Sequence, residues 1–254
     1  MNPNLESQSV LKVRNLELRY GSRMVLHEVS FDVANGSCVV VMGESGCGKS
    51  TLLKSMTGLL KPNMGNVEFG DSLLWGDTPH PNDEVLTEFG VLFQGGALWS
   101  SMNLLENISL PLETFSRLSR SEIESMAAYK LSLVGLSGCE FLYPSELSGG
   151  MQKRAGLARA LAMDPGILFL DEPSAGLDPV NSRQLDELIL ELKDSLGITF
   201  IVITHELNSI FTISDHAIFL SSHSKTILDS GRPLDLIDQS AFADVRKFLL
   251  REQK

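Results

Sequence analysis

Hydrophobic and polar residues alternate along the beginning of the chain. Apolar residues recur at every second or third position over residues 11–20 and 29–33, and Gly21 and Ser22 form a turn between these stretches. The apolar positions are Leu11, Val13, Leu16, Leu18, Tyr20, Val29, Phe31 and Val33. This alternation predicts antiparallel strands that bury one face and expose the other.

Three later stretches are apolar without interruption. They are residues 39–42, 167–170 and 199–203, and they contain many branched side chains. Continuous apolar runs of this length are typical of strands that are covered on both faces of a parallel sheet. The sequence therefore predicts a mainly parallel central sheet with the antiparallel strands at its flank.

Helical patterns lie between the first and second of these apolar runs along the chain. Ser119 and Glu122 have the spacing of a capping box, and apolar residues follow at helical spacing as far as Val134. A second helix is predicted from about Gly149 to Ala162. The fold class is therefore α/β, with an inserted helical subdomain that packs as a lobe beside the sheet.

The segment after the first apolar run matches the phosphate-binding pattern GxxxxGK[ST] and precedes residues that suit a helix. Glycines let backbone N–H groups point at phosphate oxygens, and the helix adds the positive end of its dipole. We expect Lys49 to reach the β- and γ-phosphates and Ser50 to ligate Mg²⁺. The predicted nucleotide-binding residues are Gly43, Glu44, Ser45, Gly46, Cys47, Gly48, Lys49, Ser50 and Thr51.

Two acidic residues follow the second apolar run. Asp171 and Glu172 come at the expected end of a buried strand. A nucleotide site needs a second contact to the metal and a group that activates water. We expect Asp171 to hold Mg²⁺ through water and Glu172 to act as the general base.

Composition narrows the function classes. The chain has 254 residues, with 21 Lys and Arg against 32 Asp and Glu, a net charge of −11 that disfavours nonspecific binding to nucleic acid. No run approaches the ~20 apolar residues that cross a bilayer, and the first residues lack the pattern of a secretory signal. We therefore expect a cytoplasmic protein.

The cysteines suggest neither a disulfide framework nor a zinc site. There are three, Cys38, Cys47 and Cys139, and none forms a CxxC or Cys/His pattern. Buried reduced thiols are expected in general. Cys47 lies between glycines close to Lys49 and a helix N-terminus, which favours the thiolate, so bulky alkylation there is expected to block ATP.

Residues 147–152 read LSGGMQ, and with this segment the chain resembles the nucleotide-binding subunits of ABC transporters. The resemblance covers nearly the whole chain and implies a P-loop NTPase core with the ABC ATPase fold. Tyr20 matches the aromatic residue that stacks on adenine, Gln94 the Q-loop, residues 174–178 the D-loop and His205 the switch histidine. An imidazole near the γ-phosphate can donate a hydrogen bond, and a neutral amide can contact water or Mg²⁺.

The resemblance implies a head-to-tail homodimer. Ser148, Gly149 and Gly150 open a helix and make an anion site, which in this family binds the γ-phosphate held by the opposite subunit. Two ATP molecules with Mg²⁺ would then lie in the shared interface. The implied catalytic residues are Glu172, His205, Gln94 and Lys49, and the implied metal ligands are Ser50, Gln94 and Asp171.

Three further stretches are similar to the ATPases of Mla- and Mce-type phospholipid transport systems: residues 93–112, 149–165 and 203–220. This similarity implies an MlaE-type membrane permease, an MCE-domain protein and, in some systems, a small STAS-domain subunit as partners. It places the chain peripherally on the cytoplasmic face of the inner membrane, driving lipid transport for the outer membrane. Two alternatives stay open: another ABC transporter, such as an amino-acid importer or a lipoprotein releaser, and a soluble ABC ATPase that acts on DNA or ribosomes.

The expected domain organisation has three parts. Residues 1–10 form a short tail, residues 11–240 the ATPase domain with its helical subdomain and signature helix at about 95–160, and residues 241–254 a C-terminal helical tail. That tail is interpreted either as a frayed surface helix or as a docking element. Leu98, Trp99 and Met102 either tuck into the helical lobe or line a groove for a permease helix.

Overall fold

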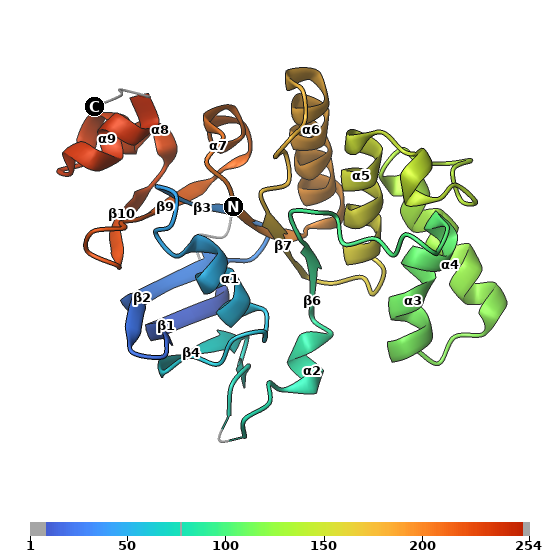
Figure 1. Cartoon of the computed structure of the whole chain (residues 1–254), viewed down its shortest axis with the longest axis horizontal. Helices are drawn as coiled ribbons and strands as arrows, with labels where there is room; N and C mark the ends of the chain where they lie inside the picture. The colour runs from blue at the N-terminus through green and yellow to red at the C-terminus, as the bar shows by residue number, and fades with distance from the viewer. Residues whose placement is uncertain (1–8, 77, 251–254) are drawn as a thin grey trace, which may run out of the picture.

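A computed structural model describes residues 9–76 and 78–250, in which two sheets lie one against the other (Figure 1). The smaller sheet is antiparallel, in the order β2 (Arg23–Ala34), β1 (Ser9–Tyr20), β4 (Met64–Phe69) and β5 (Ser72–Leu73). Every second side chain of β1 is buried until the register shifts between Val13 and Leu16, where Asn15 has a φ of 47°. The predicted alternation is confirmed.

The predicted N-terminal tail is too long by two residues. Ser9 already pairs with Ala34 of the neighbouring strand, and the Val10 carbonyl accepts a hydrogen bond from Gly70. Residues 1–8 of the predicted tail lie outside the described residues.

The larger sheet holds the three predicted buried strands at its centre. Its order is β10 (Ile227–Gly231), β9 (His216–Leu220), β3 (Cys38–Gly43), β8 (Thr199–Ile203), β7 (Ile167–Asp171) and β6 (Phe89–Leu92). All neighbours are parallel except β10, which runs antiparallel to β9. The carboxyl ends of β3, β7 and β8 therefore meet at one edge.

Both faces of the larger sheet are covered. Along β3, Val39 and Val41 pack toward the antiparallel sheet and α1 (Lys49–Met56), whereas Val40 and Met42 pack toward the remaining helices. All four side chains are buried. Burial on both faces explains why these strands read as continuous apolar runs.

The helical lobe consists of α3 (Leu104–Phe115), α4 (Arg120–Leu133) and α5 (Gly149–Ala160), which lie together beside the sheet (Figure 1). The predicted capping box of Ser119 and Glu122 is present at the start of α4. The second predicted helix begins where expected and ends slightly early, at Ala160. Two short helical segments, α2 (Asp83–Leu86) and a 3-10 turn (Pro144–Glu146), complete this half of the chain.

The C-terminal segment packs on the chain itself. After α8 (Pro233–Gln239), helix α9 (Ala243–Leu250) buries Val245 and Leu249 in the core, and the Phe248 ring meets the Phe219 ring edge-on at 5.3 Å. The interpretation as a frayed surface helix is therefore wrong for residues 243–250. Residues 251–254 lie outside the described residues.

A buried polar contact joins α6 (Pro179–Leu196) to α7 (Leu207–Ile213). The Ser209 hydroxyl donates to Asp186 Oδ2 at 2.8 Å, and Asp186 is only 3% exposed. Burial raises the pKa of Asp186 to about 6, with a smaller contribution from the Glu187 charge. The folded state therefore binds this proton more tightly than the unfolded chain does.

Asp186→Asn is expected to remove part of the pH dependence of stability. The raised pKa means that the free energy of unfolding falls as pH rises from the ordinary value of 3.8 to about 6, and levels off above. Over this pH range the free energy of unfolding is expected to fall by about 3 kcal/mol, the free-energy equivalent of the pKa difference between the folded and unfolded states. Thermal melting from pH 4 to 8 checks this, with Asp194→Asn, an exposed position on the same helix, as the control. Parallel curves for wild type and Asp186→Asn would contradict the assignment.

Candidate active site

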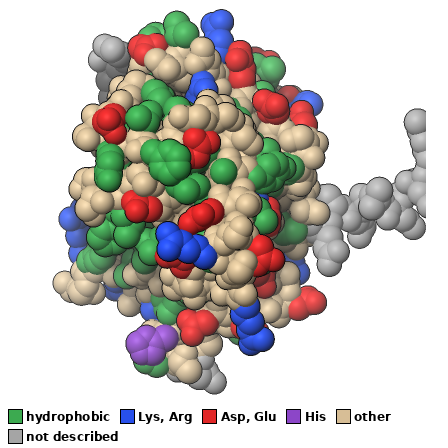
Figure 2. Space-filling model, turned by 90° about the vertical axis from the view of Figure 1, so that its right-hand side faces the viewer, with side chains coloured by type: hydrophobic (Ala, Val, Ile, Leu, Met, Phe, Trp, Pro, Cys, Tyr) green, Lys and Arg blue, Asp and Glu red, His purple; other side chains and the backbone are tan. Residues whose placement is uncertain are grey.

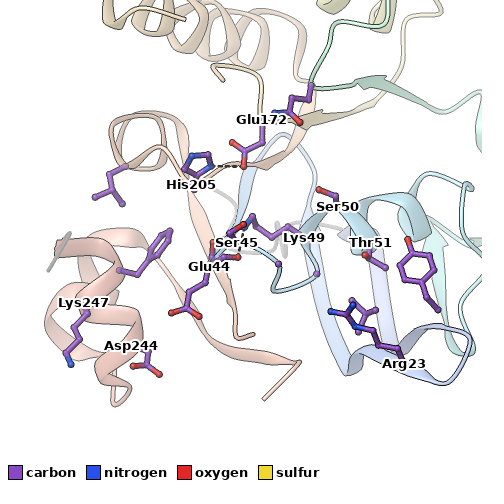
Figure 3. A pocket seen from close by; sticks show the side chains of 18 residues that line it. Arg23, Glu44, Ser45, Lys49, Ser50, Thr51, Glu172, His205, Asp244 and Lys247 are labelled. Carbon is purple, nitrogen blue, oxygen red and sulfur yellow. Dashed lines mark hydrogen bonds and ion pairs between the residues drawn. The ribbon is translucent and has the colours of Figure 1, made fainter. Parts of the chain in front are cut away.

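An open pocket of about 980 Å³ lies at the carboxyl ends of β3, β7 and β8 (Figure 3). It brings together most of the residues predicted from the sequence. Those that line it are Tyr20, Gly43, Glu44, Ser45, Gly46, Gly48, Lys49, Ser50, Thr51, Gln94, Glu172 and His205. Of these, Tyr20 is about half exposed at the rim. The volume suits a ligand of nucleotide size.

The phosphate loop connects β3 to α1 with a backbone that requires glycine at two positions. Gly43 has a φ of 148°, and a Cβ there would lie 2.3 Å from the Leu220 carbonyl oxygen. Gly48, with a φ of 110°, would place a Cβ 2.9 Å from Leu26 Cγ. A side chain at either position would displace the loop, which explains why the pattern has glycine there.

Lys49 is held by the loop that precedes it. Its ammonium group donates to the carbonyl oxygens of Gly43 at 2.8 Å and Glu44 at 3.0 Å. Lys49 is 9% exposed, so its charged end lies at the floor of the pocket beside the loop. The Glu44 side chain is fixed in turn by the Ser222 hydroxyl, at 2.6 Å from Oε2.

The acidic pair lies at the end of β7, opposite the loop. Glu172 has a φ of 47°, and its Oε1 lies 2.8 Å from His205 Nδ1 (Figure 3). Within the described part of the chain, Asp171 Oδ1 and Glu172 Oε2 are buried and have no hydrogen-bond partner. Glu172 lines the pocket, whereas Asp171, predicted as a metal ligand, is not among the residues that line it. Unpartnered carboxylate oxygens on two neighbouring residues suit a divalent cation and its water.

The charge balance around Asp171 also favours a cation. Burial raises the pKa of Asp171, and the neighbouring Glu172 carboxylate raises it further. Lys153, Lys54 and Lys49 act in the opposite direction. A positive charge added at this point would stabilise both carboxylates in their ionised form.

Lys153 is a buried cation that the sequence did not single out. It lies on α5, is 7% exposed, and its ammonium group donates to the main-chain oxygen of Gln94 and, at 3.4 Å, to that of Glu172. Burial lowers the pKa of Lys153, while the Asp171 and Glu172 charges raise it. In the sequence, Lys153 looks like any lysine on the polar face of an amphipathic helix. Only the tertiary structure shows its contacts with the two carbonyl oxygens.

The expectation that Cys47 is held as a reactive thiolate is wrong. Its side chain is 2% exposed and packs in the core against the antiparallel sheet, so it does not face the pocket. Burial raises the pKa of the Cys47 thiol and outweighs the effect of Lys49. Its N–H group hydrogen-bonds to the Glu44 oxygen, so Cys47 supports the shape of the loop.

Cys139 is expected to react with thiol reagents before Cys47 and Cys38. Cys139 is partly exposed, whereas the other two are buried and have raised pKa values, which lowers their thiolate fraction. Timed labelling of the folded protein with iodoacetamide, read by peptide mass spectrometry, measures the order. Labelling in denaturant is the control, and early modification of Cys47 in the folded protein would contradict this order.

The predicted signature residues lie outside this pocket. Ser148 caps α5 by accepting from the Met151 N–H at 3.3 Å, and both Ser148 and Gly149 are exposed at the tip of the helix. Gly150 is packed against Asn181. This exposed helix tip is therefore free to meet a ligand held by another molecule.

Several pocket residues come from places that the sequence did not indicate. Arg23 and Val25 belong to β2, Leu207 begins α7, and Asp244, Lys247 and Phe248 come from α9. The sequence around these six residues contains no nucleotide-binding motif. Only the packing of the C-terminal helix places the last three there.

Comparisons with known proteins agree with this geometry. The family described as "ABC transporter" matches residues 26–175. The chain is 42% identical over 206 residues to the probable ribonucleotide transport ATP-binding protein mkl of Mycobacterium leprae, covering 81% of this chain and 59% of that one. It thus spans about three-fifths of the length of that relative. It is 36% identical to the intermembrane phospholipid transport system ATP-binding protein MlaF of Haemophilus influenzae, over 97% of this chain and 92% of that one.

A similar solved structure is a dimer. It is the post-hydrolysis state of the ATP-binding cassette MJ0796 bound to ADP and Pi, with a TM-score of 0.76 and 29% identity, over 87% of this chain and 98% of that one.

Proposed function

This chain belongs to the ABC transporter family, and from that premise we propose that it is the ATP-hydrolysing subunit of a lipid transporter. The observation that supports the enzymatic part is the pocket itself, where a phosphate loop, a carboxylate and a histidine converge. We infer that Lys49 and the loop N–H groups bind the phosphates, and that Tyr20 stacks on the base.

The hydrolytic step follows from the arrangement opposite the loop. We infer that Glu172 takes a proton from the attacking water and that His205 fixes the Glu172 carboxylate through the 2.8 Å contact. Gln94 lines the same pocket from the loop after β6 and orients the water with its neutral amide. Ser50, Gln94 and Asp171 would hold Mg²⁺, which neutralises phosphate charge when bound.

The second part of the proposal is that each site is completed by another copy of the chain. Ser148, Gly149 and Gly150 lie away from the pocket at the start of α5, where N–H groups attract anions; Ser148 and Gly149 are exposed, and Gly150 packs behind them against Asn181. In a head-to-tail dimer this tip would contact the γ-phosphate bound by the partner. The dimeric state of the similar MJ0796 cassette supports this arrangement.

Mixing two inactive variants tests the composite site. Lys49→Ala disables the phosphate loop, and Ser148→Arg blocks the helix tip. In a heterodimer, one of the two sites regains an intact loop and an intact tip. We expect phosphate release in the mixture to reach about a quarter of the wild-type rate, because half of the dimers are mixed and each has one good site. A mixture as inactive as its components would refute the trans arrangement.

The lipid substrate is proposed from the similarity to MlaF, which extends over almost the full length of both chains. The partners would be a membrane permease of the MlaE type, an MCE-domain protein and a small STAS-domain subunit. From the same similarity, the chain would lie on the cytoplasmic face of the inner membrane. None of the helices in residues 9–76 and 78–250 is long and apolar enough to span a bilayer.

The proposed permease contact is the groove between α3 and α4. Apolar and acidic side chains lie side by side on this face of the molecule (Figure 2). Met102 lines the groove with Glu106, Leu110 and Ile123, whereas Leu98 packs into the core of the lobe and Trp99 is 57% exposed. A short permease helix with apolar residues and a basic residue would fit such a surface.

Purification of the intact complex from membranes tests the substrate class. Affinity capture of the tagged chain is expected to recover a permease and an MCE-domain protein, with phospholipid in the organic extract of the complex. Capture of an amino-acid importer's membrane subunits, or of ribosomes, would instead favour one of the alternatives.

A further inference from the structure

A stripe of three residues on α5, Lys153, Gly156 and Arg159, lies against the loop after β6. Lys153 contacts the main-chain oxygen of Gln94, and Arg159 contacts that of Ala97. Between them, Gly156 lies so close to the loop that a Cβ there would be 3.0 Å from the Gly96 oxygen. Because these positions recur every third residue, they share one face of the helix.

The Lys153 ammonium group also contacts the main chain of Glu172, the proposed general base. Lys153 Nζ lies 3.4 Å from the Glu172 carbonyl oxygen, in addition to its contact with Gln94. One buried cation thus links the main chains of two groups that act on the nucleotide of this chain. The helix that carries Lys153 is capped by Ser148, the residue proposed to act on the nucleotide of the partner.

We propose that Lys153 is a positioning residue that couples the two composite sites of the dimer. It fixes the main chain at Gln94 and Glu172 relative to the helix whose tip binds the partner's nucleotide. This inference rests on the trans arrangement proposed above. A shift of the helix on binding the partner's γ-phosphate would move the water-orienting amide and the general base of this chain's own site.

The chemistry of the position supports a positioning role over a purely structural one. Burying an ammonium group costs free energy unless carbonyl oxygens replace its water. An apolar side chain of similar length would fill the same space without that cost, but could not join two carbonyl oxygens from separate strands. Glu172 has a φ of 47°, a backbone conformation that is unfavourable for a residue with a side chain, so the hydrogen bond from Lys153 helps to hold it.

The test compares Lys153→Met and Lys153→Arg in the full chain. For Lys153→Met, which loses the hydrogen bonds to both carbonyl oxygens, we expect kcat to fall about tenfold, with KM within about twofold of wild type. The Hill coefficient for ATP is expected to drop to about one, against a wild-type value between one and two. Lys153→Arg keeps a charged donor and should restore most of the rate and the cooperativity.

Two further variants serve as a control and as a second test. Arg154→Met removes the neighbouring cation, which contacts Gln184 on α6 instead of the loop, and should leave kcat and cooperativity unchanged. Arg159→Met loses the contact to Ala97 at the edge of the stripe and should lower kcat in the same direction. It provides the measurement if Lys153→Met does not fold.

Each outcome decides between the claims. Wild-type kcat and cooperativity in Lys153→Met, or equal losses in Arg154→Met, would overturn the coupling role while the trans arrangement stands. Activity that fails to return in the mixing experiment, with a Hill coefficient of one in the wild type, would overturn both.

Discussion

Glu172→Gln is expected to lower the ATP turnover rate by about 100-fold or more, the usual contribution of a general base. Glutamine keeps the shape of the side chain but cannot accept the proton of the attacking water. The phosphate loop is untouched, so ATP still binds. Closed dimers should therefore accumulate in the presence of ATP, because the contacts to the γ-phosphate persist on both sides of the interface.

Phosphate release and gel filtration with and without ATP measure these two effects. Glu191→Gln, an exposed carboxylate on α6, is the matched control and should retain wild-type turnover without trapping dimers. An undiminished rate in Glu172→Gln would show that another group activates the water, and the assignment of the general base would have to be abandoned.

Lys49→Ala is expected to weaken ATP binding about 10- to 100-fold, since a charge-assisted hydrogen bond to an anion contributes about 1.5–3 kcal/mol. The lysine lies at the floor of the pocket beside the loop, where its ammonium group can reach phosphate oxygens. Titration calorimetry with ATP gives the dissociation constant. In contrast to Glu172→Gln, this variant should form no ATP-dependent dimer.

The matched control is Lys54→Ala, an exposed lysine on the same helix that does not line the pocket. Its ATP affinity should stay within about twofold of wild type, because Lys54 acts on the site only through its charge on Asp171, and solvent screens this charge at an exposed position. Equal losses in the two variants would mean that net charge, and not the specific contact, governs binding.

The sequence predicted the parts of the site whose signals are local. The phosphate loop occupies consecutive residues between a strand and a helix, and Asp171 and Glu172 directly follow a buried strand. Parallel pairing of β3, β7 and β8 then brings these separate segments to one edge. The three apolar runs were enough to expect a parallel sheet, because continuous runs rich in branched side chains are typical of strands covered on both faces.

What the sequence could not predict depends on side-chain direction and on distant contacts. The Cys47 hypothesis considered the neighbours along the chain but not the turn of the loop, which points the thiol into the core. Phe248 reaches the pocket only because α9 folds back on β9. The Lys153 contacts join residues that lie far apart in sequence, where periodicity gives no signal.

The two carbonyl oxygens that hold the Lys49 ammonium have a thermodynamic consequence for ligand entry. When phosphate binds, the Lys49 ammonium must exchange carbonyl oxygens for phosphate oxygens. The enthalpy of binding is therefore the difference between these two sets of hydrogen bonds. Discrimination among ligands would then come from how much more negative charge a triphosphate offers than a peptide oxygen. A carboxylate or a monophosphate of similar shape gains far less from the same exchange.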